Sequence, residues 1–332
     1  MNQLKIDTEL TRMLGIRYPI IMAPMFLVSN AKMAIEANNA GITGAIPALN
    51  YRTDTDFRKA LDEIRQGCTG PVGINLIVNK SNLKLKEQLQ TCLDYRVEYI
   101  ITSLGSPQKV IDACKPKGIK VFSDVVDERF AKKVEAMGAD AIIAVNADAG
   151  GHAGPLPAAE LIPLLVKACG IPVISAGGVG VGEQLLEKLE WGACGASIGS
   201  PFIASDEADV SMEYKQAIID YGAKDIVMTT KISGTPCTVI NTPYVEEIGT
   251  RQNWFESLLN KNRSLKKYAK MLTFYKGMKA LEKAAFSATY KTVWCAGPSI
   301  EYVDSIRPVK EIVETLVNGY FAAKEKETFV LS

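Results

Sequence analysis

The stretch NADAGGHAGPLP at residues 146–157 combines the only histidine of this 332-residue chain with several glycines. His152 follows Gly150 and Gly151 and precedes Gly154, residues whose lack of a side chain lets a backbone approach a ligand closely. An unperturbed imidazole has a pKa of about 6.5, so it is largely neutral near pH 7 and can act as a general base. We therefore predict a ligand-binding loop in which His152 has a functional role.

Other chemistry at this loop has less support. A structural histidine that only hydrogen-bonds its own loop remains an alternative interpretation. Zinc is a poor third interpretation, because a single histidine without neighbouring Cys or His residues cannot complete a zinc site, and no metal is predicted. The cysteines offer no better nucleophile, since Cys68 and Cys194 stand at the starts of predicted strands, remote from the loop. Cys237 alone could overhang the site, from a later part of the chain.

The elements that must position this loop are short, apolar, β-rich runs that alternate with helical patterns. Each run is apolar almost throughout, which is typical of parallel strands covered on both faces. The eight runs are PIIMA (19–23), ITGAI (42–46), PVGINL (71–76), EYIIT (98–102), IKVFS (119–123), DAIIAV (140–145), PVISA (172–176) and GASIG (195–199).

The segments between the runs are predicted to be helices that end near glycine, as in NAKMAIEANNAG, DERFAKKVEAMGA and GEQLLEKLEWGA. Eight strand–helix repeats predict an α/β fold of the (β/α)8 TIM-barrel type, which takes about 250 residues. An open doubly wound sheet is the alternative, because periodicity alone does not prove that the sheet closes.

The repeat pattern breaks after Pro201. We assign residues 1–210 to the barrel and residues 211–304 to a smaller, mainly helical accessory domain that acts as a lid. A C-terminal amphipathic helix at about 305–332 would return to the barrel. The basic cluster from Lys261 to Lys270 is interpreted as a solvated helix face.

Active sites of TIM barrels are built at the C-terminal ends of the strands. For the polar residues that end the fourth and fifth runs, an ordinary turn or helix cap is the preferred interpretation; these are Thr102, Ser103, Ser123 and Asp124. The remaining candidates at these ends are Ala23, Pro24, Met25, Asn75, Asp148, His152, Ala176, Gly177, Gly178, Gly199 and Ser200.

The last two strand ends together predict a phosphate site. Gly177 and Gly178 precede a helix, and Gly199 and Ser200 follow the eighth run. TIM barrels commonly hold a phosphate in the loops after strands seven and eight, with a helix N-terminus directed at it. Glycines let backbone N–H groups reach the phosphate oxygens. Two ordinary tight turns are the alternative interpretation.

Composition excludes other classes of function. A formal net charge of +1 leaves no broad basic surface for a nucleic acid. The longest apolar runs are far shorter than the roughly 20 residues that span a bilayer. The N-terminal sequence MNQLKIDTELTRMLG is polar and unlike a secretory signal. Seven scattered cysteines predict reduced thiols and a cytoplasmic protein.

Five motifs in this order give the chain a resemblance to a known family: YPIIMAPM, GINL, DAGGHAGP, PVISAGGVGVG and GACGASIGSPFIAS. The barrel region, about 15–210, resembles the nitronate monooxygenase family, formerly called 2-nitropropane dioxygenases. That family also includes FMN-dependent enoyl-acyl-carrier-protein reductases and NAD(P)H:quinone reductases. The resemblance implies a TIM barrel that binds FMN without a covalent bond, with the isoalloxazine ring over the barrel mouth.

The resemblance also implies roles for individual residues. His152 would be the base, Asn75 would hydrogen-bond the flavin, and the glycines after the last two strands would hold its phosphate with Ser200. This chain departs from the family pattern at Phe26 and Leu27, where small residues are usual, at Asp148 in place of glutamate, and at Ser200 in place of threonine. The implied FMN-binding residues are Ala23, Pro24, Met25, Asn75, Asp148, Gly150, Gly151, Ala176, Gly177, Gly178, Gly199 and Ser200.

Three functions remain open at this stage. The first is FMN-dependent oxidation of alkyl nitronates by dioxygen to a carbonyl compound and nitrite, with His152 as base. The second is reduction of an enoyl thioester or a quinone, with NAD(P)H as a further partner. The third is a flavin- or phosphate-binding module without turnover. The sequence leaves a homodimer open. Tyr244 could face the mouth, but packing within the accessory domain is its preferred interpretation.

Overall fold

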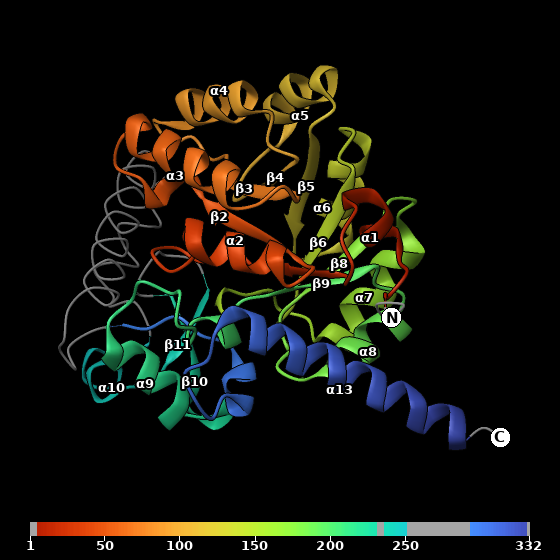
Figure 1. Cartoon of the computed structure of the whole chain (residues 1–332), viewed down its shortest axis with the longest axis vertical. Coiled ribbons are helices and arrows are strands. Elements are labelled where there is room, and N and C mark those ends of the chain that lie inside the picture. Colours follow the sequence, from red (N-terminus) through yellow and green to blue (C-terminus); the bar gives the residue numbers. More distant parts are fainter. Residues whose placement is uncertain (1–4, 231–235, 251–292, 331–332) are drawn as a thin grey trace.

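The structure, a computed structural model, describes residues 5–230, 236–250 and 293–330. Its centre is a closed barrel of parallel strands in the order β1-β2-β3-β4-β5-β6-β8-β9 (Figure 1). The barrel strands are β1 (Ile20–Met22), β2 (Thr43–Pro47), β3 (Val72–Ile77), β4 (Tyr99–Ser103), β5 (Lys120–Val125), β6 (Ala141–Val145), β8 (Val173–Ala176) and β9 (Gly195–Ile198). All eight predicted runs are confirmed as strands.

Pairing of the first strand with the last closes the barrel. Ile21 of β1 lies opposite Thr43 of β2 on one side and opposite Ser197 of β9 on the other. This register confirms the TIM barrel, and the open doubly wound sheet that the sequence left as an alternative is wrong. A closed parallel sheet has no exposed edge and buries its inner face, which explains why the strands are apolar almost throughout.

Helices surround the barrel as predicted (Figure 1). Three of them end two residues before a glycine with a positive φ angle: Gly41 after α2, Gly138 after α6 and Gly192 after α8. The helices of this part are α1 (Glu9–Leu14), α2 (Ala31–Asn39), α3 (Asp54–Gly67), α4 (Leu85–Tyr95), α5 (Gln108–Cys114), α6 (Glu128–Ala136), α7 (Ala158–Ala168) and α8 (Gly182–Glu190).

The described part of the accessory region is not only helical. It contains α9 (Met212–Asp220), β10 (Ile226–Thr229), β11 (Cys237–Ile240) and α10 (Pro243–Ile248). The two strands form an antiparallel sheet with β7 (Gly151–His152), which belongs to the loop after β6. This sheet was not predicted. The predicted helical stretch that includes Lys261–Lys270 lies outside the described residues, and the boundary at residue 210 remains a proposal.

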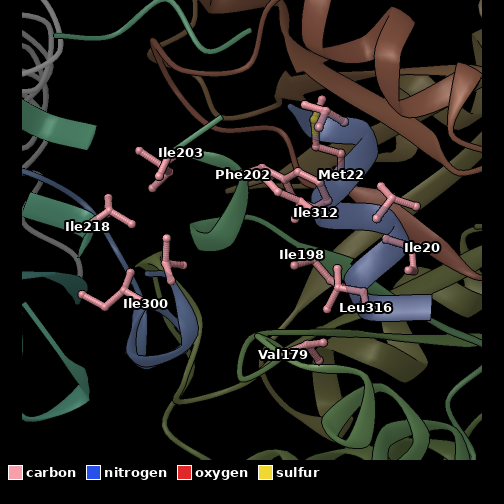
Figure 2. Close-up of a cluster of buried hydrophobic side chains, with 14 of the residues drawn as sticks. Ile20, Met22, Val179, Ile198, Phe202, Ile203, Ile218, Ile300, Ile312 and Leu316 are labelled. Atoms are coloured by element: carbon pink, nitrogen blue, oxygen red, sulfur yellow. The ribbon is translucent and has the colours of Figure 1, made fainter. Parts of the chain in front are cut away.

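The C-terminal helix α13 (Val309–Val330) lies beside the barrel helices. It packs against α8, where Gly182 and Gly319 allow the two backbones to approach closely. Figure 2 shows part of the apolar cluster on this side, with Met22 and Phe202 beside Ile312. Because a fully buried Phe side chain contributes about 1.5–3 kcal/mol, Phe202 helps to fix the accessory segments and α13 on the barrel.

The barrel interior below the C-terminal ends of the strands is filled with side chains. Tyr99 of β4 and Phe122 of β5 stack at 5.0 Å between ring centroids and are fully buried. Ile21, Ile101 and other apolar residues complete this inner cluster. The barrel is therefore a packed core, and in such barrels ligands bind at the C-terminal ends of the strands. Among the described residues, no helix is both long and apolar enough to cross a membrane.

Candidate active site

One half of the floor of the barrel mouth, called the small half, is formed by small residues, and the other half is formed by polar residues. Side chains alternate between the two faces of a strand, so residues two positions after the buried inner residues also face inward. By this rule Ile101 and Phe122 place Ser103 and Asp124 at the mouth. Neighbouring strands β8, β9 and β1 bring Ala176, Gly199 and Ala23 to the same level, while β3, β4 and β5 bring Asn75, Ser103 and Asp124.

The turn after β1 is fixed by side chains that the sequence did not single out. The Ser29 hydroxyl accepts from the Met25 amide at 2.9 Å and donates to the Ala23 carbonyl at 2.9 Å. Asn50 accepts from the amide of Leu27 at 2.8 Å and donates to the Ser29 carbonyl at 2.8 Å. Leu27 has a φ of 59°, which is uncommon for a residue with a side chain. These bonds hold the backbone of residues 23–27 in one shape beside the mouth.

Asn146 organises the loop after β6. Its carbonyl oxygen accepts from the amide of Asp148 at 2.9 Å, and its amide nitrogen donates to the Gly177 carbonyl at 3.1 Å. The side chain is completely buried. Asn146 therefore ties the histidine loop to the glycine loop after β8. The signal that could have found it is a polar residue directly after the apolar run of β6.

Replacing Asn146 with alanine should destabilise the protein. The change leaves the part-buried Asp148 amide and Gly177 carbonyl without their partner, at a cost of up to about 1–3 kcal/mol for each unsatisfied group. Urea unfolding of the FMN-free protein should show this loss. The control is Asn39→Ala at the exposed end of α2, which should change stability by less than about 0.5 kcal/mol. Equal stability of the two variants would contradict the role given to Asn146.

His152 is held by the accessory sheet. It is part of β7, and its partner in the antiparallel pairing is Cys237 of β11. The next residue of β11, Thr238, donates its hydroxyl to the carbonyl of Ala149 at 2.6 Å, and to the carbonyl of Gly151 at 3.3 Å. A segment 85 residues later in the chain thus sets the position of the histidine loop.

The electrostatics of His152 suit a base. The side chain is exposed, yet the protein around it lowers the pKa of the imidazole from its ordinary value of 6.5 by desolvation. The neutral form is therefore favoured more strongly than in water. A neutral imidazole can accept a proton without first losing one.

The glycines after β8 are required by close packing. Gly177 has a φ of 112°, and a Cβ there would lie 2.4 Å from Oδ1 of Asn146. Gly178 has a φ of 72°, and a Cβ there would lie 3.1 Å from Oδ2 of Asp148. The two predicted loops, after β6 and after β8, are therefore in contact. Asp148 lies against Gly178 as part of this contact.

The end of β9 meets the same loops. The Ser200 hydroxyl accepts from the amide of Gly297 at 2.9 Å, which leaves its own hydrogen free to be donated elsewhere. A Cβ on Gly150 would lie 2.9 Å from both the Gly297 nitrogen and the Ser200 oxygen. Gly199 faces the turn after β1, since a Cβ there would lie 3.4 Å from the Met25 sulfur. The structure brings Gly150, Gly199 and Ser200 together with Gly297, which the sequence did not single out.

These loops fit the phosphate of a flavin nucleotide. In the described part of the chain, no oxygen accepts a hydrogen bond from the amides of Gly178, Val179 or Gly199. The register of β8 and β9, with Ala176 opposite Ser197, brings these amides to neighbouring strand ends. Unpaired N–H groups in a glycine-rich turn bind anions. The small half of the floor has no side chain larger than a methyl group at Ala23, Ala176 and Gly199.

Two residues of the accessory region that could have faced the site pack away from it. Cys237 is buried in the accessory sheet, with its sulfur 3.7 Å from that of Cys295, so it lines no site. Tyr244 packs against the same small apolar cluster, which agrees with the packing alternative.

The interpretation of Ser103 and Asp124 as a turn or cap is wrong, because both lie within strands and hydrogen-bond each other. Thr102 and Ser123 likewise bond each other within strands.

Comparisons with known proteins agree with this geometry. The model of the family described as nitronate monooxygenase matches residues 7–319. A Mycobacterium tuberculosis protein named (3aS,4S,5R,7aS)-5-hydroxy-7a-methyl-1-oxo-octahydro-1H-indene-4-carboxyl-CoA dehydrogenase is 28% identical, over 81% of this chain and 76% of that protein. A probable nitronate monooxygenase of Staphylococcus aureus is 29% identical, over 72% and 80%. The solved structure of FabK from Thermotoga maritima has a TM-score of 0.86 and 28% identity, over 98% and 100%.

Proposed function

Because the chain belongs to the nitronate monooxygenase family and is an oxidoreductase of that flavoenzyme kind, we propose that it binds FMN and oxidises alkyl nitronates with dioxygen. The products would be a carbonyl compound and nitrite. The observation that carries the proposal is the placement of His152, the only histidine of the chain, on a loop whose position two other elements fix. The lowered pKa of the imidazole supports its role as a base.

The chain would hold FMN with the groups described above. The amides of Gly178, Val179 and Gly199 and the hydroxyl of Ser200 would take the phosphate. When bound, FMN supplies the redox chemistry, and the protein supplies position and electrostatics. The family resemblance implies that the ring would lie over the mouth, and the small side chains of the floor at Ala23 and Ala176 support this.

His152 would remove a proton from the α-carbon of a neutral nitroalkane. Such a proton is acidic because the nitro group takes up the negative charge of the resulting nitronate. The flanking glycines Gly150 and Gly151 let the substrate approach the imidazole closely. The backbone pairing of His152 with Cys237 keeps the imidazole on the C-terminal side of the barrel.

The pH dependence should reflect the lowered pKa of His152. A base is active in its deprotonated form, so kcat/KM for a neutral nitroalkane should fall as the pH drops through the pKa of the imidazole. Since that pKa lies below 6.5, the midpoint of this decline should fall below pH 6.5. Initial rates of nitrite release at several pH values test this. A midpoint above pH 6.5 would contradict the assignment.

A second candidate is a reductase that passes hydride from NAD(P)H to an enoyl thioester. The match to FabK spans nearly the whole chain, and the name of the Mycobacterium tuberculosis relative specifies a CoA thioester. Such a reaction needs a proton donor for the carbon that receives no hydride. A histidine with a lowered pKa is a weaker match to that role, because it is largely deprotonated near pH 7.

Steady-state assays of the FMN-loaded protein separate these candidates. Release of nitrite with uptake of dioxygen on addition of propionate-3-nitronate is the expected result. Oxidation of NADH or NADPH with a quinone or an enoyl thioester, and no nitrite release, would support the reductase instead. Silence in both assays from a protein that binds FMN would support a binding module without turnover.

A further inference from the structure

A chain of three polar side chains crosses the floor of the mouth. Asn75 of β3 donates from its amide nitrogen to the hydroxyl of Ser103 of β4 at 2.7 Å. Ser103 donates in turn to the carboxylate of Asp124 on β5 at 2.5 Å. Neither Ser103 nor Asp124 has a role in the function proposed above. Three adjacent strands thus carry one hydrogen-bonded chain that ends in a carboxylate.

The direction of every hydrogen bond in this chain is fixed by its ends. The amide nitrogen of Asn75 also lies 3.2 Å from the carbonyl oxygen of Ile101, which can only accept. The nitrogen of the side-chain amide therefore faces β4. At the other end, an ionised carboxylate can only accept, so the Ser103 hydrogen is directed to Asp124 and its oxygen is left to accept from Asn75.

This arrangement determines what Asn75 can offer to a ligand. Both amide hydrogens are used within the chain, one by Ile101 and one by Ser103. The carbonyl oxygen, Oδ1, is then the polar atom of Asn75 that a ligand can use. Asn75 is only 8% exposed, so turning its amide over would take this donor away from the buried Ile101 carbonyl and the part-buried Ser103 hydroxyl.

The carboxyl group behind this chain carries a charge near neutral pH. Asp124 is half-buried, and burial raises the pKa of its carboxyl to about 6, against the opposing effect of the Ser103 hydrogen bond. At pH 8 the group is ionised. A half-buried negative charge acts over several ångströms more strongly than an exposed one, because water and salt screen it less.

We propose that Asp124 and Ser103 are positioning residues that hold Asn75 with Oδ1 toward the mouth, so that a flavin ring there meets a hydrogen-bond acceptor backed by a negative charge. The inference rests on the FMN site of the proposed function. A nearby negative charge opposes the addition of electrons to the ring. The three hydrogen-bonded side chains would therefore lower the reduction potential of bound FMN. They would also present Oδ1 of Asn75 as an acceptor to an N–H group of the ring.

The same two strands provide a matched control. One position earlier on each strand, the hydroxyls of Thr102 and Ser123 hydrogen-bond at 2.9 Å on the opposite face. Both residues are buried, and neither belongs to the site. Ser123→Ala removes one inter-strand hydroxyl contact of β4 and β5, as Ser103→Ala does, but it leaves the floor of the mouth intact.

The test compares Asp124→Asn, Ser103→Ala, Ser103→Thr and Ser123→Ala at pH 8, each loaded with FMN. Its measurements are the FMN dissociation constant from fluorescence quenching and the midpoint potential from equilibration with a reference dye. Asp124→Asn should strengthen the binding of reduced FMN relative to that of oxidised FMN by tenfold or more. A tenfold change raises a two-electron reduction potential by about 30 mV. Ser103→Ala should shift the potential in the same direction and weaken the binding of oxidised FMN several-fold.

Ser103→Thr keeps the hydroxyl and should restore wild-type values, and Ser123→Ala should match the wild type in both measurements. If both Asp124→Asn and Ser103→Ala keep the wild-type potential, or if Ser123→Ala shifts it equally, the inference is wrong while the proposed FMN site stands. If Asp124→Asn fails to fold, Ser103→Ala with its Ser103→Thr counterpart decides. A wild-type protein that does not bind FMN would overturn both the inference and the proposed function.

Discussion

His152→Gln is expected to lower kcat/KM for a neutral nitroalkane by about 10²–10⁴-fold, the usual contribution of a positioned general base. Glutamine has a similar size and polarity but does not accept a proton near neutral pH. His152 is exposed, so the change removes no buried packing, and the backbone pairing of β7 with β11 does not depend on the side chain. Initial rates of nitrite release with nitroethane provide the measurement.

The nitronate form of the same substrate is the internal control. A nitronate has already lost the proton that His152 would remove, so the variant should turn it over at a rate close to that of the wild type. FMN affinity should also be unchanged, because the protein groups predicted to bind its phosphate lie on other loops. Equal losses with nitroethane and with ethyl nitronate would show that His152 serves binding or structure instead of proton transfer. An unchanged rate with nitroethane would remove its catalytic role altogether.

Gly177→Ala is expected to have the second large effect, on folding and on FMN binding together. A Cβ at Gly177 would lie 2.4 Å from Oδ1 of Asn146 and 2.5 Å from the Ala149 nitrogen, in a backbone with a φ of 112°. Strained backbone costs about 1–3 kcal/mol and overpacking about 1–3 kcal/mol, so a loss of about 2–6 kcal/mol follows. The displaced loop should weaken FMN binding at least tenfold. Urea unfolding and fluorescence titration measure the two effects.

Gly118→Ala separates strain from crowding. Gly118 also has a positive φ, 72°, but a Cβ there would meet nothing within 4 Å, and the residue lies before β5, at the opposite end of the barrel. This variant should lose only about 1–2 kcal/mol and keep its FMN affinity. If Gly177→Ala proves no more harmful than Gly118→Ala in both measurements, the close contact between the loops after β6 and β8 does not support the site.

The barrel could be predicted because its signals are local. Parallel strands buried on both faces are apolar throughout, so runs such as DAIIAV and PVISA stand out from the helices between them. Glycines after helices, such as Gly138 and Gly192, mark where those helices end. The position of the active site then follows from the fold, since TIM barrels place it at the C-terminal ends of the strands.

The accessory sheet could not be predicted in the same way. Strand β7 consists of two residues, Gly151 and His152, and it exists because β11 pairs with it. No local pattern marks so short a strand. The support from Thr238 to the histidine loop is equally non-local, because its hydroxyl reaches the carbonyl of Ala149 from 89 positions later in the chain.

The polar residues behind the site were missed for a related reason. Asn146 and Asp124 each stand at the end of an apolar strand, where a turn or cap is the common explanation for a polar residue. Their roles depend on partners on other strands and loops, Gly177 for one and Ser103 for the other. Counting from Phe122 in steps of two would have placed Asp124 on the inner face.

The most direct test of the central claim is anaerobic mixing of the FMN-loaded protein with propionate-3-nitronate and, separately, with NADPH, while the flavin absorbance is recorded. The proposed function predicts rapid loss of the oxidised flavin spectrum with the nitronate and no change with NADPH. Full bleaching by NADPH with no response to the nitronate would contradict it and assign the protein to the reductases of its family.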